Sequence, residues 1–133
     1  NEISWLKANE ELLNYYYQKG DYQEASQYFK NIQTTYPYNQ EAQLKYVSIL
    51  FKDSHWQKII EFNEEFLGTF EHTKLSYYCG VAYYKIGNFK KSLKCFENTK
   101  KLLETNFYQL SDIEKAKLYK YYEKGLKKIG KNG

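Results

Sequence analysis

Side chains able to do acid–base or nucleophilic chemistry are few and scattered in this chain. The histidines are His55 and His72, and the cysteines are Cys79 and Cys95. A general base needs an oriented partner, and no Ser, Cys or Asp lies at a recognisable motif spacing from either histidine. The cysteines form neither a CxxC pair nor a cluster of zinc ligands, so we expect free thiols. These patterns predict a protein that is not an enzyme and that holds no metal and no cofactor.

The composition predicts a helical domain that folds without disulfides or bound metals. The chain has 133 residues, 42% of them hydrophobic and 27% charged, with one proline and seven glycines. A chain of this length buries a core without disulfides or metals, and one domain over residues 1–133 is expected. Sixteen tyrosines are unusually many, and their rings suit half-buried positions at helix contacts or along a binding surface.

Positive charge gathers at the C-terminal end, and all of it comes from lysine because the chain has no arginine. Seven lysines and three acidic residues lie between 111 and 133, whereas the rest of the chain has thirteen of each. Such a surface could meet an acidic protein, anionic lipid or a phosphate backbone, or it could simply keep a helix face hydrated. The missing arginines disfavour specific reading of nucleic acid. The secondary basic surface comprises Lys120, Lys124, Lys127 and Lys128.

Three short turns repeat one pattern along the chain. They are Gly20-Asp21-Tyr22, Ser54-His55-Trp56 and Gly87-Asn88-Phe89. Their aromatic third residues are separated by 34 and then by 33 residues. A period of 34 residues is that of tetratricopeptide helix pairs, so the turns divide the chain into repeats.

The residues around these turns resemble the tetratricopeptide repeat family over roughly residues 7–101. The third unit carries a small-residue step and a tyrosine in Cys79-Gly80-Val81-Ala82-Tyr83, followed by Ser92 and Phe96. The first unit carries Leu12, Tyr16, Ala25, Phe29 and Pro37 at the spacing of the family. The second unit departs most from the pattern, with Val47, Leu50, Ile59 and Asn63 at those places.

The predicted fold is all-α, and the resemblance implies a right-handed superhelix of three helix pairs plus a C-terminal capping helix. The pairs cover approximately residues 6–38, 40–71 and 73–104, and the capping helix covers 111–130. Apolar periodicity predicts helices over 2–18, 40–52, 56–70, 73–86, 89–103 and 112–129, with another between Asp21 and Pro37. Capping boxes are expected at Asp21 with Glu24 and at Ser111 with Glu114, and a left-handed residue is expected at Gly20.

The resemblance also implies a concave groove lined by the first helix of each pair. Such a groove suits a peptide or helix of a partner protein, with rings as anchors and lysines that meet acidic side chains. The predicted function is therefore protein–protein interaction that supports assembly of a multiprotein complex. The groove positions are Asn14, Tyr17, Gln18, Leu44, Ser48, Phe51, Lys52, Tyr77, Val81, Tyr84 and Lys85.

Two alternatives remain open. One is self-association through the aromatic N-terminal face around Trp5, and the other is nonspecific binding of a membrane or nucleic acid by the lysine-rich helix. Nucleic acid is the less favoured of these anionic partners. The absence of methionine and the lysine, asparagine and tyrosine bias predict a soluble domain cut from a longer microbial protein, at the cell envelope or alternatively in the cytoplasm.

Overall fold

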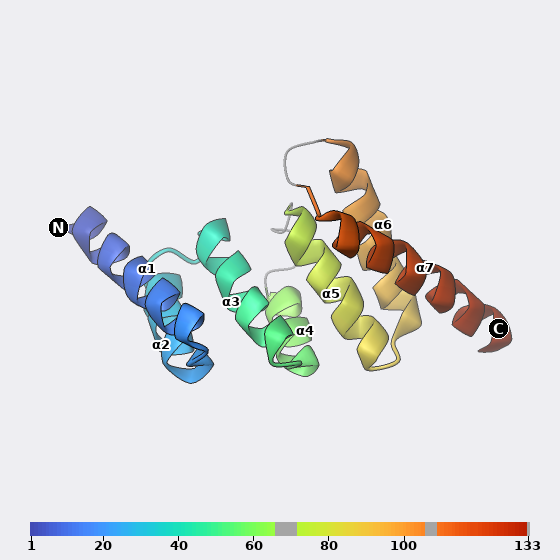
Figure 1. Ribbon diagram of the computed structural model, residues 1–133, viewed down its shortest axis with the longest axis horizontal. Coiled ribbons are helices and arrows are strands. Elements are labelled where there is room, and N and C mark those ends of the chain that lie inside the picture. The colour runs from blue at the N-terminus through green and yellow to red at the C-terminus, as the bar shows by residue number, and fades with distance from the viewer. Residues whose placement is uncertain (66–71, 106–108, 133) are drawn as a thin grey trace. The chain divides into compact units, whose positions relative to one another are not determined.

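A computed structural model describes residues 1–65, 72–105 and 109–132. Within these ranges every regular element is an α-helix, as the sequence predicts (Figure 1). The predicted helix over 56–70 is confirmed as far as Glu65, and its remaining residues lie outside the described ones. The helices are α1 (Glu2–Lys19), α2 (Tyr22–Thr35), α3 (Gln40–Lys52), α4 (Trp56–Glu65), α5 (Thr73–Lys85), α6 (Phe89–Glu104) and α7 (Asp112–Asn132).

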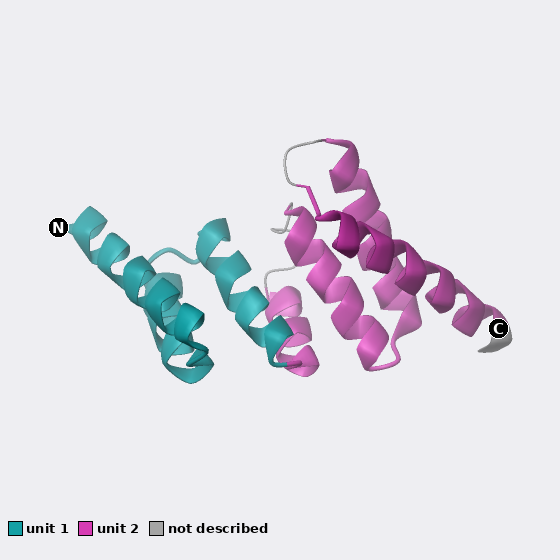
Figure 2. Ribbon diagram, viewed as in Figure 1, with its two compact units in different colours: residues 1–53 teal, residues 54–133 magenta. Residues whose placement is uncertain are grey.

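The helices form two compact units, which Figure 2 shows in different colours. Unit 1 comprises residues 1–53 and contains α1, α2 and α3, with α2 packed against both of the others. Unit 2 comprises residues 54–133, in which α5 packs against α4, α6 and α7, and α6 also packs against α7. The boundary falls between α3 and α4, inside the second predicted repeat.

All three repeated turns contain a left-handed residue at the same place. The φ angles are 81° at Gly20, 57° at Ser54 and 87° at Gly87. After Gly20 and Gly87 the backbone N–H of the next residue donates to the carbonyl oxygen five residues earlier, Asp21 to Tyr16 at 3.0 Å and Asn88 to Tyr83 at 2.9 Å. Glycine adopts this conformation at no steric cost, whereas Ser54 holds it with a Cβ in place.

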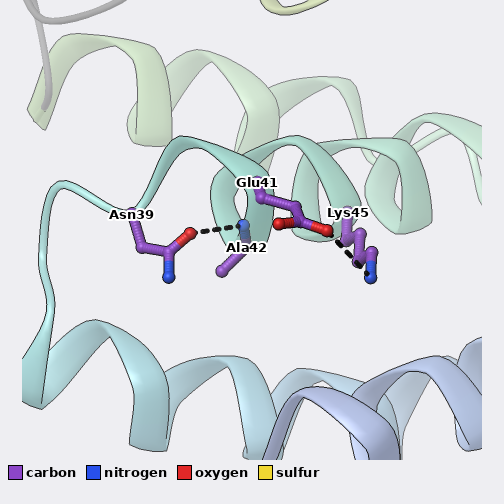
Figure 3. A network of polar contacts seen from close by, with 4 residues as sticks. All are labelled: Asn39, Glu41, Ala42 and Lys45. Carbon is purple, nitrogen blue, oxygen red and sulfur yellow. Dashed lines mark hydrogen bonds and ion pairs between the residues drawn. The ribbon is translucent and has the colours of Figure 1, made fainter. Parts of the chain in front are cut away.

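Local side chains define where the helices begin. The Asp21 carboxylate accepts a hydrogen bond from the Glu24 N–H at the start of α2. At the start of α3 the Asn39 amide oxygen accepts from the Ala42 N–H at 3.1 Å, and Glu41 pairs with Lys45 (Figure 3). At the start of α7 the predicted capping box is complete. Ser111 and Glu114 exchange two bonds, from each backbone N–H to the other side chain, at 2.9 Å and 3.2 Å.

The core of unit 1 is built where α2 meets its two neighbours. Ala25, Phe29 and Ile32 of α2 are buried. The Phe29 ring stacks on Tyr46 of α3 with centroids 4.1 Å apart. On the other side, Tyr28 stacks on Tyr16 of α1 at 5.5 Å. Aromatic pairs of this kind add to the stabilisation that burial alone provides.

The core of unit 2 depends on a close approach of α5 and α6. The Phe96 ring lies against the backbone of Gly80, so closely that a Cβ at Gly80 would collide with it. The Ser92 hydroxyl donates to the Gly80 carbonyl oxygen at 2.7 Å. A second glycine, Gly125 of α7, lies near Leu93 of α6, and a Cβ there would make a tight contact of 3.3 Å with the Leu93 side chain.

Candidate functional site

The two histidines occupy different surroundings. His72 is buried and forms the N-cap of α5, where its Nδ1 accepts a hydrogen bond of 3.2 Å from the Lys74 N–H. Burial, assisted by the Lys74 ammonium, lowers the pKa of His72 below its ordinary value. His55 is exposed in the turn before α4. The lowered pKa favours the neutral form of His72, in which Nδ1 can accept the hydrogen bond that caps α5.

The two cysteines are free thiols inside unit 2. Burial raises the pKa of Cys79 well above its ordinary value, and it raises the pKa of Cys95 to about 11 although Lys91 opposes the shift. A thiol reacts as its thiolate, so both groups are poor nucleophiles near neutral pH. Among the described residues no group of three or more His, Cys, Asp and Glu side chains is placed to hold a metal ion.

Within unit 1, the predicted groove positions repeat along two helices with a 34-residue offset. Tyr17 of α1 corresponds to Phe51 of α3, and both are half-buried. The Lys52 ammonium nitrogen lies 4.9 Å from the centroid of the Tyr17 ring, so the ends of α1 and α3 meet through a cation–π contact. The remaining members are Asn14 and Gln18 on α1 and Leu44 and Ser48 on α3, half-buried except for Gln18, which is exposed.

Tyr22, which no groove motif includes, joins the same surface. Its ring centroid lies 6.1 Å from that of Tyr17, so the ring of the repeated turn supports the groove position from the side of α2. On the adjoining face of α1, the Lys19 ammonium lies 4.6 Å from the Tyr15 ring. The end of α1 is thus a cluster of tyrosines bordered by two lysines, and the signal for it in the sequence is the run Tyr15-Tyr16-Tyr17.

In unit 2 the groove positions of α5 do not form an open surface. Tyr77 and Val81 are only 2% and 1% exposed, which corrects their assignment as contact residues for a partner. The physical reason is that α7 packs against α5 and α6. Burial raises the pKa of Tyr77, and the nearby Glu114 and Tyr121 of α7 raise it further. Both residues are therefore part of the core.

The other two predicted positions of α5 contact the capping helix. The Tyr84 ring lies 4.8 Å from the ring of Tyr121, and the Lys85 ammonium lies 5.7 Å from that same ring. Tyr121 also stacks on Phe96 at 6.3 Å. Tyr121 is a second residue, after Tyr22, that the predicted site does not include, because no repeat motif extends into the last helix. The open part of the predicted site within a single unit is consequently the α1 and α3 surface.

An apolar stripe on α1 is exposed where equivalent positions on other helices are covered. Trp5, Leu12 and Tyr15 are 40%, 39% and 51% exposed. They lie on one face of α1 at helical spacing. At an offset of 34 residues, Leu12 corresponds to Tyr46, which is covered by Phe29 of α2. At an offset of 67, Leu12 corresponds to Cys79, which is buried on α5.

The predicted basic surface lies on one side of α7. Lys120, Lys124, Lys127 and Lys128 are all exposed, and Lys117 joins them. At 3.6 residues per turn these five lysines fall within an arc of about 100°, and every position of that arc between 117 and 128 is a lysine. We call this row the basic arc. The Lys128 ammonium also lies 5.8 Å from the ring of Phe89.

A comparison with models of known protein families finds no match, and a comparison with curated protein sequences finds none either. In the described part of the chain, no helix combines the length and the apolar character needed to cross a bilayer.

Proposed function

We propose that this chain is a tetratricopeptide-like repeat module that binds a segment of a partner protein and supports the assembly of a complex. The proposal includes the right-handed superhelical arrangement of helix pairs that characterises the family. Its support is the set of three left-handed turns at Gly20, Ser54 and Gly87, together with the close approach of Gly80 and Phe96 within a helix pair. These are the places where a repeat of this kind needs a turn and a small residue.

The proposed binding site rests on the contact between the Tyr17 ring and the Lys52 ammonium group. The ring provides apolar area, and the ammonium 4.9 Å from its centroid provides a positive charge at the same point. A partner segment with an apolar side chain followed by an acidic one would use both groups. Gln18 at the exposed end of α1 would then supply a hydrogen bond at the rim.

Photo-crosslinking tests this site directly. A photoreactive amino acid at Gln18 should crosslink a discrete partner in cells of the source organism. The same group at Gln27, an exposed position on α2, is the matched control and should not. Tyr17→Ala in the Gln18-labelled chain should abolish the crosslink, with helix content unchanged by circular dichroism. Equal crosslinking from both positions, or a product that survives Tyr17→Ala, would reject the α1 and α3 surface.

Self-association is a second candidate function, which the exposed stripe on α1 favours. Trp5, Leu12 and Tyr15 form an apolar face on a helix whose counterparts are covered. If two copies pack these stripes against each other, the apolar face that is exposed to water in a single copy becomes buried. Sedimentation equilibrium should then give a mass that rises with concentration, and Leu12→Glu should return it to 16.1 kDa. A constant monomer mass for the unmodified chain excludes this function.

A further inference from the structure

The basic arc on α7 is a single-sign surface. Its five ammonium groups are exposed, and none of them is ion-paired with an acidic side chain of the described residues. At a rise of 1.5 Å per residue, the row from Lys117 to Lys128 is about 16 Å long. The acidic residues of α7, namely Asp112, Glu114 and Glu123, all fall outside the arc. Such a row attracts an anionic partner along its whole length.

Packing within unit 2 fixes α7, the helix that carries the basic arc. Leu118 is fully buried, Gly125 lies against Leu93, and Tyr121 contacts Phe96, so one side of α7 is fixed by packing. Lys128 borders this packed side through its contact with Phe89. A fixed helix presents its lysines as a nearly straight line. A straight line of charges fits a plane better than it fits the curved and grooved surface of a duplex.

The residue types in the arc also favour a flat anionic surface over a nucleic-acid duplex. Lysine offers a single hydrated charge, and it lacks the planar fork with which arginine reads guanine or grips a phosphate. The arc from Lys117 to Lys128 contains no aromatic residue on which a base could stack. Clusters of four to eight basic residues on an amphipathic helix are typical of binding to anionic lipids.

One apolar residue lies at the head of the row. Ile113 is 70% exposed, and at 100° per residue it falls in the middle of the same arc as the lysines. A phosphate backbone offers no apolar surface to an aliphatic group that lies in line with the lysines. The boundary between lipid headgroups and acyl chains accepts it, because the apolar group leaves water there while the ammonium groups stay among the phosphates.

From this juxtaposition we infer that α7 docks onto the surface of an anionic lipid bilayer, with the basic arc against the headgroups and Ile113 inserted at their base. The interaction is peripheral and reversible. It is independent of the partner surface on α1 and α3, since it uses other residues in the other unit. Screening shortens the reach of exposed charges to about 10 Å at 0.1 M salt, so binding should weaken steeply as salt is added.

The test compares two variants of the whole chain with the same net charge. Lys117, Lys120, Lys124 and Lys127 are changed to glutamine in the arc variant. Lys58, Lys90, Lys94 and Lys101, which are exposed on α4 and α6, are changed to glutamine in the control. Flotation with phosphatidylcholine vesicles that contain phosphatidylglycerol should show binding by the original chain and by the control. The arc variant should bind roughly 100-fold or more weakly.

Three outcomes would overturn the inference. The first is that the original chain does not float with these vesicles at low salt. The second is that the arc variant and the control lose binding equally, which would show that only net charge matters. The third is tighter binding to a short DNA duplex or to polyglutamate than to the vesicles at the same ionic strength. Unchanged helix content by circular dichroism shows that each variant is folded.

Discussion

The Phe96 ring of α6 lies directly against the backbone of Gly80 in α5, with no room for a side chain between them. The Ser92 hydroxyl reinforces the contact by donating a hydrogen bond to the Gly80 carbonyl oxygen. Phe96 is fully buried, so its ring cannot swing into solvent to relieve an intrusion. This contact sets how closely α5 and α6 pack at this point.

Gly80→Ala should therefore destabilise the protein although alanine favours helices. The added methyl group collides with the Phe96 ring, and overpacking of this kind costs about 1–3 kcal/mol in the free energy of unfolding. Urea denaturation followed by circular dichroism measures the change. Gly130→Ala on α7 is the matched control, since nothing lies within 4 Å of the added group, and it should be neutral or slightly stabilising. Equal effects of the two changes would contradict the packing argument.

Ser54→Gly should stabilise the turn before α4. Ser54 holds a φ of 57°, a region in which a residue with a Cβ is strained by roughly 1–2 kcal/mol. Glycine removes the strain but gains freedom in the unfolded chain, so a net increase of about 0.5–1 kcal/mol is expected. Thermal melting measures it. The reciprocal change Gly87→Ser, at the corresponding place of the next turn, should lower stability. A loss of stability in Ser54→Gly would show that its side chain outweighs the backbone strain.

Stability should fall as the solution becomes mildly acidic, and His72 is one cause. Its pKa in the folded chain lies below the ordinary value of 6.5, so the unfolded chain binds more protons between those two values. The contribution is complete above about pH 6.5 and is lost as the pH falls towards the folded pKa. Protonation also removes the acceptor at Nδ1 that caps α5.

His72→Asn keeps a capping acceptor and removes the titrating group. Melting temperatures measured between pH 5 and pH 7 should therefore vary less in this variant than in the original chain. The difference between the two chains should be largest at the acidic end, where the original histidine is protonated on unfolding. Parallel curves across the whole range would exclude His72 as a source of the pH dependence.

Cys95 should resist alkylation while the chain is folded. Its pKa of about 11 leaves little thiolate at pH 8, so iodoacetamide should label it roughly 100-fold more slowly than an unstructured cysteine. Cys79, which is fully buried, should react more slowly still. Mass spectrometry of digested samples resolves the two sites. Rates in urea supply the reference, and a folded rate equal to the urea rate at Cys95 would contradict the burial described.

The sequence predicts the turns and helix ends well because those depend on neighbouring residues. Gly20 adopts the left-handed conformation expected of it, α2 ends just before Pro37, and the Ser111 capping box forms as expected. Each of these features involves residues within a few positions of one another. Interactions between residues this close in the sequence form in the same way however the rest of the chain packs.

The candidate site was harder to predict because exposure depends on distant parts of the chain. Periodicity assigns Tyr77 and Val81 to one face of α5, but it does not say that α7 packs on α5 and leaves both residues buried. Tyr121, which makes several of the contacts, belongs to no repeat motif. The same limit applies to the basic arc, whose lysines are exposed because Leu118 and Gly125 lie on the packed side of α7 and the lysines do not.

The choice of lysine at every position of the basic arc also determines which covalent chemistry can change it. A primary amine loses its charge when it is acylated, whereas the guanidinium of arginine stays protonated and is a poor nucleophile towards the same acyl donors. All five groups are exposed, and none is paired with a described acidic residue, so each is open to an acyl donor. Acylation of all five would therefore lower the formal side-chain charge of α7 stepwise from +4 (seven lysines and three carboxylates) to −1, because Lys115 and Lys131 keep their charges.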